Sequence, residues 1–205
     1  MRIGVLGTGV VGQTLSAALS DRGHDVVVGS RTSPPATFAA AAQHGELVIN
    51  CTAGEHSLEA LRAAGEDALA DKVLVDVANP LDFSQGFPPS LTVGCDDSLA
   101  EQIQREFPRA RVVKTLNTVT ASVMVDPGIL AESTDVFVAG DDAAAKGQVT
   151  ELLVSLGWAS SRVRDLGGIE AARATESYLL TWVRLMGVLG TAGFNLRIVT
   201  DQPST

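Results

Sequence analysis

The chain is poor in cysteine and in charged residues. It has two cysteines, Cys51 and Cys95, which are too few for a disulfide framework and show no metal-like spacing. We therefore expect ordinary buried or incidental thiols and no metal site. Charged residues make up only 19% of the chain and hydrophobic residues 45%, which excludes a disordered protein and predicts a soluble globular one with a large core.

Basic residues are the scarcest charges. Lys and Arg total 15 against 24 Asp and Glu, so the net charge is -9. A field of this sign repels nucleic acid and anionic membrane surfaces, and we expect neither as a partner. An anionic ligand would need a local basic group.

Neither a leader peptide nor a membrane span is expected. The N-terminus, MRIGVLGTGVVG, enters a strand at once and lacks the layout of a signal peptide, so we expect a cytoplasmic protein. The apolar stretch 177–196 carries Arg184 near its centre and is diluted by glycine, threonine and asparagine. It is better interpreted as a buried or interfacial helix than as a span.

Short apolar runs alternate with helix-like segments through most of the chain. Such alternation is typical of βαβ units and predicts an α/β protein with a Rossmann-type doubly wound parallel sheet. The expected strands are residues 2–6, 25–29, 47–51, 73–77, 111–114 and 135–139. The expected helices are residues 11–21, 57–65, 98–106 and 142–156, with Ser57, Ser98 and either Asp141 or Asp142 as N-caps.

Two proline-rich stretches, RTSPPATF and NPLDFSQGFPPSL, are predicted to be loops, because proline breaks helices and central strands. After residue 166 the alternation stops. We predict a nucleotide-binding domain over residues 1–166 and a helical extension over 167–205. The long helix of the extension is apolar on more than one face, so we expect it to cover its own sheet and also a second subunit, giving a homodimer.

The first expected strand runs straight into a G-x-G-x-x-G motif. Its residues are Gly7, Thr8, Gly9, Val10, Val11 and Gly12. In this pattern the first glycine permits a tight turn, the second lets a pyrophosphate approach the backbone, and the third lets helix and strand pack closely. The motif alone is weak, and a glycine-rich turn without a ligand is the alternative. Its place between a strand and a helix favours a dinucleotide site.

The second strand ends in Ser30, Arg31 and Thr32, with no acidic residue. An Asp or Glu at this place would bind the ribose 2'-hydroxyl of NAD, whereas an arginine with small hydroxyl residues suits the 2'-phosphate of NADP. A solvated surface arginine is the alternative. The glycine motif fixes the position, so we predict that NADP(H) is the cofactor.

The loops after the third, fourth and fifth strands should meet at the carboxyl edge of the sheet. Small or neutral polar residues in them suit contact with the nicotinamide and a second flat ring: Thr52, Ala53, Asn79, Pro80, Asn117 and Thr118. For Asn79 and Pro80 a plain turn is an equal alternative. His56 is the one histidine in these loops, and without a recognisable partner it is interpreted as a surface or nucleotide-contacting residue rather than a general acid or base.

No catalytic acid or base is predicted. Lys114 ends a strand and its direction is open. Hydride transfer between two cofactor rings needs alignment and exclusion of water more than proton transfer by side chains, which fits so sparse a set of residues.

At this point the sequence resembles the NADP oxidoreductases that depend on the 8-hydroxy-5-deazaflavin coenzyme F420, and also the cytoplasmic domain of STEAP-type metalloreductases. The similarity rests on IGVLGTGVVGQTLSAAL, GHDVVVGSR, VVKTLNTVTA, VFVAGDDAAAKGQVTELLVSLGW and the closing IEAARATESYLLTWVRL, with VLVDVANPLDF similar to the metalloreductases. It covers nearly the whole chain. The stretch NPLDFSQGFPPS departs from the deazaflavin enzymes and leaves the electron acceptor open.

The resemblance implies an NADPH-binding Rossmann domain that dimerises and stacks a deazaflavin or flavin co-substrate on the nicotinamide. It implies pyrophosphate contacts for Thr8, Val10 and Val11, 2'-phosphate contacts for Ser30 and Arg31, groove contacts for Ala53 and His56, and nicotinamide contacts for Asn117 and Thr118.

Two alternatives remain. A reductase of imines or β-hydroxyacids shares the N-terminal motifs, but the sequence after residue 166 is too short for the helical second domain of such enzymes. A non-catalytic NADPH-sensing protein fits the absence of an evident acid or base.

Overall fold

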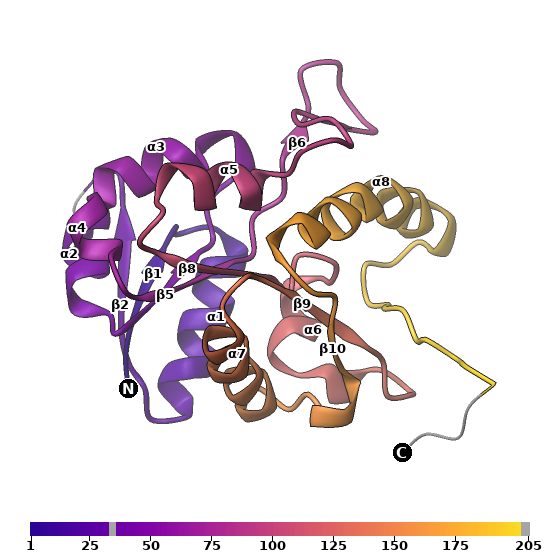
Figure 1. The fold of residues 1–205 in the computed structure, drawn as a ribbon. Coiled ribbons are helices and arrows are strands. Elements are labelled where there is room, and N and C mark those ends of the chain that lie inside the picture. Colours follow the sequence, from indigo (N-terminus) through magenta and orange to yellow (C-terminus); the bar gives the residue numbers. More distant parts are fainter. Residues whose placement is uncertain (33–35, 202–205) are drawn as a thin grey trace.

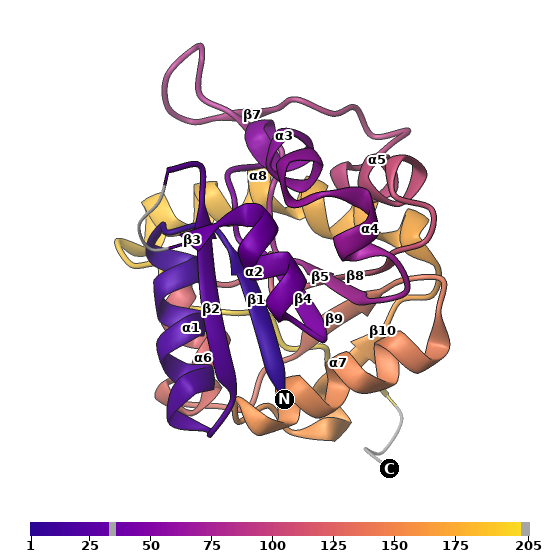
Figure 2. The same ribbon diagram turned by 90° about the vertical axis from the view of Figure 1, so that its left-hand side faces the viewer.

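The computed structural model describes residues 1–32 and 36–201. In that part of the chain one sheet of eight strands lies between two layers of helices (Figures 1 and 2). The strand order is β10-β9-β8-β5-β4-β1-β2-β3. The strands are β1 (Arg2–Leu6), β2 (Asp25–Ser30), β3 (Ala36–Thr37), β4 (Leu47–Asn50), β5 (Val73–Asp76), β8 (Arg111–Thr115), β9 (Val136–Ala139) and β10 (Val163–Asp165). The chain winds outward from β1 in both directions, which confirms the predicted doubly wound α/β fold.

The prediction of a parallel sheet is wrong at one strand pair. β9 runs antiparallel to β8, so that Lys114 is paired with Ala139 and Thr115 with Val138. The connection from β8 to β9 begins and ends at the same edge of the sheet. Because it does not cross to the opposite edge, β9 must run antiparallel to β8. β10, which was not predicted, then pairs parallel with β9 at the sheet edge.

Eight α-helices in the described residues cover the sheet. They are α1 (Val10–Asp21), α2 (Phe38–His44), α3 (Gly54–Ala64), α4 (Glu66–Leu69), α5 (Leu99–Glu106), α6 (Ala121–Val125), α7 (Ala143–Ser155) and α8 (Ala172–Leu189). Side chains alternate across each strand. In β1, Ile3 and Val5 join the core with α1, α6 and α7, whereas Leu6 joins the core with α2, α3 and α5. The central strands β4 and β5 are buried on both faces and are mainly apolar, with a polar residue only at their carboxyl ends.

Helix α2 was not predicted. The prediction that RTSPPATF is a loop is wrong at its end, where Ala36 and Thr37 form β3 and Phe38 begins α2; residues 33–35 lie outside the described part. Thr37 caps the helix by accepting a hydrogen bond from the Ala40 N–H at 3.1 Å. The helix lies very close to β1, because a Cβ on Gly4 would stand 2.2 Å from the Ala41 carbonyl oxygen. A short, alanine-rich helix carries little periodic signal, and the close approach that fixes it is tertiary.

The expected helix caps were correct at Ser98 and Asp142, and wrong at Ser57. Each of the first two accepts a hydrogen bond from a backbone N–H of its helix. Ser57 instead lies inside α3, fully buried, and bonds to Asn50 below it. The helix starts earlier, at Gly54, with Ala53 as its N-cap residue.

The second proline-rich stretch is a loop as predicted, with a short two-stranded sheet at its base, β6 (Leu81–Asp82) and β7 (Ser90–Leu91). The loop projects beyond the body of the molecule (Figures 1 and 2). Phe83 and Phe87 on it are 58% and 66% exposed. Large apolar side chains are rarely so exposed without a ligand or partner.

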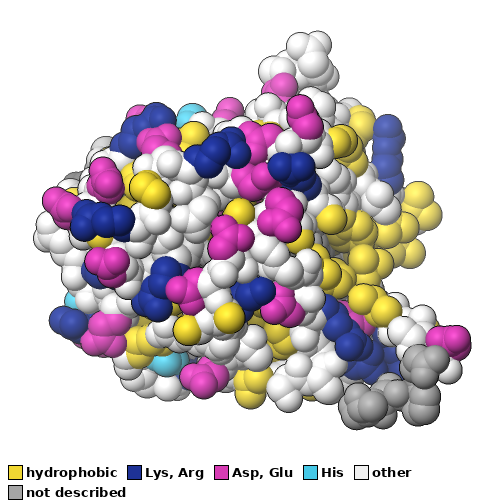
Figure 3. All heavy atoms as spheres, viewed as in Figure 1, with side chains coloured by type: hydrophobic (Ala, Val, Ile, Leu, Met, Phe, Trp, Pro, Cys, Tyr) yellow, Lys and Arg dark blue, Asp and Glu magenta, His cyan; other side chains and the backbone are white. Residues whose placement is uncertain are grey.

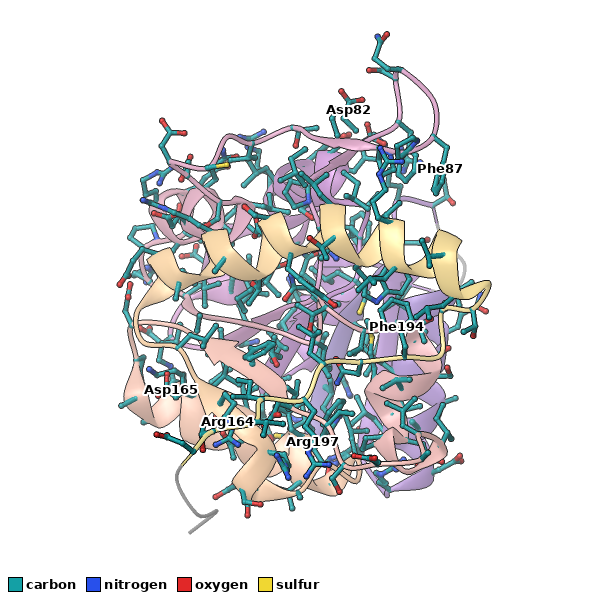
Figure 4. All side chains as sticks on the ribbon, turned by 90° about the vertical axis from the view of Figure 1, so that its right-hand side faces the viewer. Asp82, Phe87, Arg164, Asp165, Phe194 and Arg197 are labelled. Carbon is teal, nitrogen blue, oxygen red and sulfur yellow. The ribbon has the colours of Figure 1, made fainter. Side chains whose placement is uncertain are left out.

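The long C-terminal helix is shorter than predicted. A 3-10 turn, Ile169–Ala171, precedes α8, and an extended segment follows it. One face of α8 buries Leu179 and Val183. The other apolar face was expected to pack against a second subunit. Part of it is instead covered by the same chain, because Phe194 of the extended segment (Figure 4) stacks on Trp182 of α8 with ring centroids 5.3 Å apart.

The extended segment is held at the start of β9. The Asp135 N–H donates to the Leu196 carbonyl at 2.9 Å, and the Asp135 carboxylate accepts from the Ile198 N–H. On the surface, hydrophobic side chains gather over α8 and this segment, while charged ones spread over the rest of the face (Figure 3). No helix in the described residues combines the length and apolarity that a membrane span requires.

Candidate functional site: a dinucleotide groove

A groove of about 1050 Å³ opens at the carboxyl edge of β1, β2 and β4. β1 pairs with β2 on one side and β4 on the other, so the groove lies where the strand order reverses. This is the place where open α/β sheets bind ligands. The lining residues are Gly7, Thr8, Gly9, Gln13, Val28, Ser30, Arg31, Thr32, Phe38, Cys51, Thr52, Ala53, His56, Glu59, Ala60 and Ala63.

The glycine motif forms a tight turn under the groove. Gly7 has φ 118°, and its N–H donates to the Gly29 carbonyl at 2.9 Å. A Cβ on Gly12 would lie 2.1 Å from the Gly7 carbonyl oxygen, so α1 can pack on the turn only with glycine there. At Gly9, by contrast, a Cβ would meet no atom within 4 Å. The space above Gly9 is open to a ligand.

The N-terminus of α1 faces this space without a cap of its own. Gly9 is its N-cap and offers no side-chain acceptor, and the first turn has no acidic residue. The first N–H groups of a helix have no partner inside it and carry a partial positive charge. Gln13 steadies the turn by donating to the Thr8 carbonyl at 2.8 Å. The arrangement suits an anion bound by backbone N–H groups.

The far end of the groove carries a positive charge at the end of β2. Ser30 and Thr32 form a small turn, in which the Thr32 N–H donates to Ser30 Oγ at 3.2 Å. Arg31 lies between them, exposed, and in the described part of the chain its guanidinium has neither an ion pair nor a hydrogen bond. A phosphate here would gain a planar set of N–H donors with no partner to displace.

Helix α3 forms the opposite wall. His56 and Glu59 lie on its groove face, with His56 Nδ1 and Glu59 Oε2 4.0 Å apart. His56 Nε2 also lies 3.7 Å from Glu55 Oε1, and its side chain is 48% exposed. Glu55 and Glu59 are themselves largely exposed, so the surroundings of His56 are those of a surface residue.

Cys51 lies at the bottom of the groove. Burial raises the pKa of its thiol well above the ordinary range, and the carboxylate of Asp76 adds to the effect. A high pKa keeps the sulfur protonated and therefore a poor nucleophile. Cys51 serves as a wall of the groove.

A buried polar network supports the floor of the groove. Asn50 Nδ2 donates to Asp76 Oδ1 at 2.8 Å and to Ser57 Oγ at 3.1 Å. Its Oδ1 accepts from the Thr52 hydroxyl at 2.7 Å. Thr52 lines the groove, so its side chain is oriented by groups that a ligand never touches.

Lys114, near the carboxyl end of β8, joins the same buried network through Asp76. The structure settles its direction: the side chain points inward, with Nζ 2.7 Å from Asp76 Oδ2 and 2.9 Å from Glu176 Oε1. Burial lowers the pKa of this ammonium, but the two carboxylates outweigh it and hold the pKa above the ordinary lysine value. Lys114 is therefore charged at neutral pH and does not supply or take a proton.

The loops after β5 and β8 hold each other through two asparagines. Asn79 Nδ2 donates to the Asn117 carbonyl at 2.9 Å, and Asn117 Nδ2 donates to Asn79 Oδ1 at 3.0 Å. Gly54 at the start of α3 packs on the same loop, since a Cβ there would lie 2.1 Å from the Asn79 carbonyl oxygen. Three loops from distant parts of the chain are thus joined beside the groove.

The structure gathers the predicted residues in two places. The groove is lined by Gly7, Thr8, Gly9, Ser30, Arg31, Thr32, Thr52, Ala53 and His56. Outside this lining lie Val10, Val11 and Gly12 in the first turn of α1, and Asn79, Pro80, Asn117 and Thr118 in the joined loops. Asn117 and Thr118 are buried.

Sequence reasoning missed several lining residues: Gln13, Val28, Phe38, Cys51, Glu59, Ala60 and Ala63. A signal existed for those on α3. His56, Glu59 and Ala63 follow helical spacing and therefore share a face of that helix. Phe38 gave no such signal, because α2 itself was not predicted.

Comparison with known proteins agrees with this site. No protein-family model matches the chain. A solved structure from Arthrobacter sp. FB24, provisionally named an F420-dependent NADP-reductase, is 52% identical, covers 98% of this chain and 100% of its own, and superposes with a TM-score of 0.93. The F420-dependent NADP reductase of Methanothermobacter marburgensis is 29% identical over 86% of this chain and 88% of its own.

The chain is therefore an NADP-dependent oxidoreductase with a Rossmann-type fold. It belongs to the family of F420-dependent NADP reductases.

Two further proteins share part of this similarity. Metalloreductase STEAP3 of Rattus norvegicus is 30% identical over 86% of this chain. The chain spans about a third of that protein's length, since the match covers 36% of it. An imine reductase from Streptomyces aurantiacus, 20% identical with a TM-score of 0.65 over 93% of this chain and 64% of its own, shares the fold.

The glycine turn gives a paired prediction. Gly9→Ala should leave the melting temperature unchanged, because Gly9 has an ordinary φ of -70° and open space around it. It should weaken NADPH binding on the order of tenfold to a hundredfold, because the new Cβ fills the open space above the turn and holds the pyrophosphate away from the backbone N–H groups, whose charge-assisted hydrogen bonds are worth about 1.5 to 3 kcal/mol each. Gly12→Ala should lower both the melting temperature and the affinity for NADPH, because its Cβ would clash with the Gly7 carbonyl oxygen. Overpacking of this kind costs about 1 to 3 kcal/mol. Calorimetry and NADPH titration test this; tight binding by Gly9→Ala would contradict it.

Proposed function

We propose that this chain transfers a hydride between NADPH and a deazaflavin or flavin coenzyme, with the deazaflavin F420 as the favoured partner. One observation carries the cofactor half of the proposal: an uncapped helix N-terminus and a free Arg31 guanidinium open into the same groove. The 52% identity to a protein provisionally named an F420-dependent NADP-reductase supports the other half.

In the proposed complex NADPH lies along the groove. Its pyrophosphate rests on the turn of Thr8 and Gly9 and the first turn of α1, and Ser30, Arg31 and Thr32 hold the 2'-phosphate. Ala53 and His56 line the wall for the nucleotide. The nicotinamide extends past Thr52 toward the joined loops of Asn79 and Asn117. Those loops lie at the carboxyl edge of β5 and β8, beside the switch point.

The chemistry proposed for this site needs no acid or base from the protein. NADPH, when bound, supplies a hydride to the acceptor ring and becomes NADP⁺, and the acceptor takes its proton from water. The chain's own residues bind, orient and exclude solvent, which fits a groove whose one histidine is exposed and whose cysteine stays protonated.

We propose that the acceptor ring approaches from the side of α8 and the loop between β6 and β7. The exposed Phe87 on that loop, near α8 in Figure 4, offers an apolar surface for a flat ring. This loop is where the sequence departs from the deazaflavin enzymes, so it is the place to look for acceptor preference.

A second function, reduction of an imine or β-hydroxyacid, is less well supported. The imine reductases share the fold at 20% identity or less, and this chain covers only 62–64% of their chains. A non-catalytic NADPH sensor is the remaining alternative, and it is distinguished by turnover.

Arg31→Ala should weaken NADPH binding on the order of tenfold to a hundredfold and barely change NADH binding, because the lost charge-assisted hydrogen bonds, about 1.5 to 3 kcal/mol each, are made to the 2'-phosphate alone. Titration of both nucleotides measures the ratio. Arg109→Ala is the matched control, since this exposed arginine pairs with Asp67 away from the groove. Equal losses for NADPH and NADH would contradict the assignment.

The acceptor is identified by turnover. Purified protein should oxidise NADPH when F420 is present, and more slowly or not at all with FMN, FAD or a cyclic imine. Nicotinamide oxidation without protein is the control for spontaneous transfer. Turnover with the imine alone would favour the second function, and tight NADPH binding without turnover would favour a sensor.

We also propose a homodimer formed through α8, the core of the extension over residues 167–205. Leu180, Val188 and Leu189 are exposed on this helix, and hydrophobic side chains gather on the surface over α8 (Figure 3). Analytical ultracentrifugation at micromolar concentration should give a dimer, and Val188→Glu with Leu189→Glu should shift it to monomer. A wild-type monomer at that concentration would refute the dimer.

A further inference from the structure

Three buried charges join three distant parts of the chain. Lys114 at the end of β8 contacts Asp76 at the end of β5 and Glu176 in α8, at 2.7 Å and 2.9 Å. Its ammonium also donates to the Ala78 carbonyl. The side chains of Lys114 and Asp76 are 0% exposed and that of Glu176 is 3% exposed.

Every charge in this cluster has further partners. Asp76 Oδ1 accepts from Asn50 Nδ2 at 2.8 Å and from the Ala78 N–H at 3.2 Å. The Glu176 carboxylate accepts from the N–H groups of Leu99 and Ala100, at 2.8 Å and 3.2 Å. Glu176 thereby caps the first turn of α5 from a different helix, and the hydrogen bonds continue unbroken from α8 to Asn50.

Stability alone does not explain such a cluster. Removing three groups from water carries a large desolvation penalty, and well-packed apolar side chains in their place are often as stable or more so. A buried charge cluster does, however, permit only one arrangement of its partners, since each displaced partner leaves a charge unpaired.

The cluster lies directly behind the ring end of the groove. Lys114 is the penultimate residue of β8, and two residues after it comes Leu116, whose φ of 60° is rare for a non-glycine residue, followed by Asn117. Along β5, Asp76 is followed by Ala78, bonded to the cluster by both its backbone groups, and then by Asn79. Asn79 and Asn117 therefore each follow a strand end whose position is fixed by Lys114.

A second set of hydrogen bonds connects the cluster to the groove through Asn50. Asp76 holds Asn50, and Asn50 orients the hydroxyl of Thr52, which lines the groove. Through Asn50 and Ala78 the cluster is thus connected to both groups on which the nicotinamide would rest.

We propose that Lys114 is a positioning residue, which clamps β5, β8 and α8 into the one arrangement that sets Thr52 and the asparagine pair for the nicotinamide ring. The inference rests on the proposed function, because it assumes a nicotinamide in this groove. It assigns α8 a role at the ring end: Glu176 makes the geometry of the loops depend on the docking of the C-terminal helix.

Lys114→Met and Glu176→Gln test the proposal. Both should lower kcat for NADPH oxidation with F420 on the order of tenfold to a hundredfold, because misplacing a reacting ring by about 1 Å has effects of that size. The Kd for NADPH should change far less, since the phosphate contacts are remote from the cluster. Kd is measured by titration, and kcat at saturating NADPH, at a temperature where each variant is fully folded.

Val149→Ala is the control. Val149 is fully buried on α7, on the opposite side of the sheet, and its truncation destabilises the fold without touching the cluster. A purely structural role for Lys114 predicts that all three variants keep wild-type kcat while folded. The inference would be overturned if kcat were unchanged in Glu176→Gln and Lys114→Met. It would also be overturned if the affinity for NADPH fell in parallel with kcat.

The outcomes separate this inference from the function on which it rests. Should Lys114→Met not fold, Glu176→Gln decides, because it keeps the side chain's size and removes only its charge. A wild-type protein that neither binds nor oxidises NADPH would overturn the proposed function and this inference together. An active wild type with unaffected variants would overturn this inference alone.

Discussion

The buried ion pairs of Lys114 with Asp76 and Glu176 are the interaction on which the carboxyl edge of the sheet depends. Two parallel strands and the C-terminal helix meet at one ammonium, and no one of these elements can shift without leaving a charge unpaired in the interior. The helix that follows the sheet is thereby tied to the loops beside the groove. The N-terminal end of the groove is held differently, by close packing of backbone on backbone at Gly7 and Gly12.

These two means of support match the two ends of a dinucleotide. Phosphates need N–H groups and a positive charge within reach of solvent, and an open turn with the exposed Arg31 offers both. A flat ring that exchanges a hydride needs a fixed surface and few competing groups. The joined loops of Asn79 and Asn117, hydrogen-bonded to each other and backed by the cluster, are such a surface. The helix N-terminus and Arg31 give this groove a local positive charge in a protein that is acidic as a whole, and the proposed anion site rests on that difference.

Much of the fold and part of the groove lining were predictable because their signals are local. The turn of Gly7, Gly9 and Gly12 and the strand end at Arg31 are short runs whose roles follow from backbone conformation and from distance along one βαβ unit. Other features were not predictable in this way. Helix α2 is too short to show a period, and β9 runs backwards because its connection returns to the same edge. Ser57 has the composition of a helix cap, but it bonds to a buried asparagine instead.

The sequence by itself determined the class of the fold, the place of the glycine turn and the residues at the end of β2, since each depends on residues near one another in the chain. Only the tertiary structure decided which way Lys114 points. A lysine at a strand end can reach solvent or turn inward, and the choice rests on Asp76 and Glu176, which come from distant parts of the chain. The energy of a buried charge belongs to all its partners together, so no local pattern can reveal it.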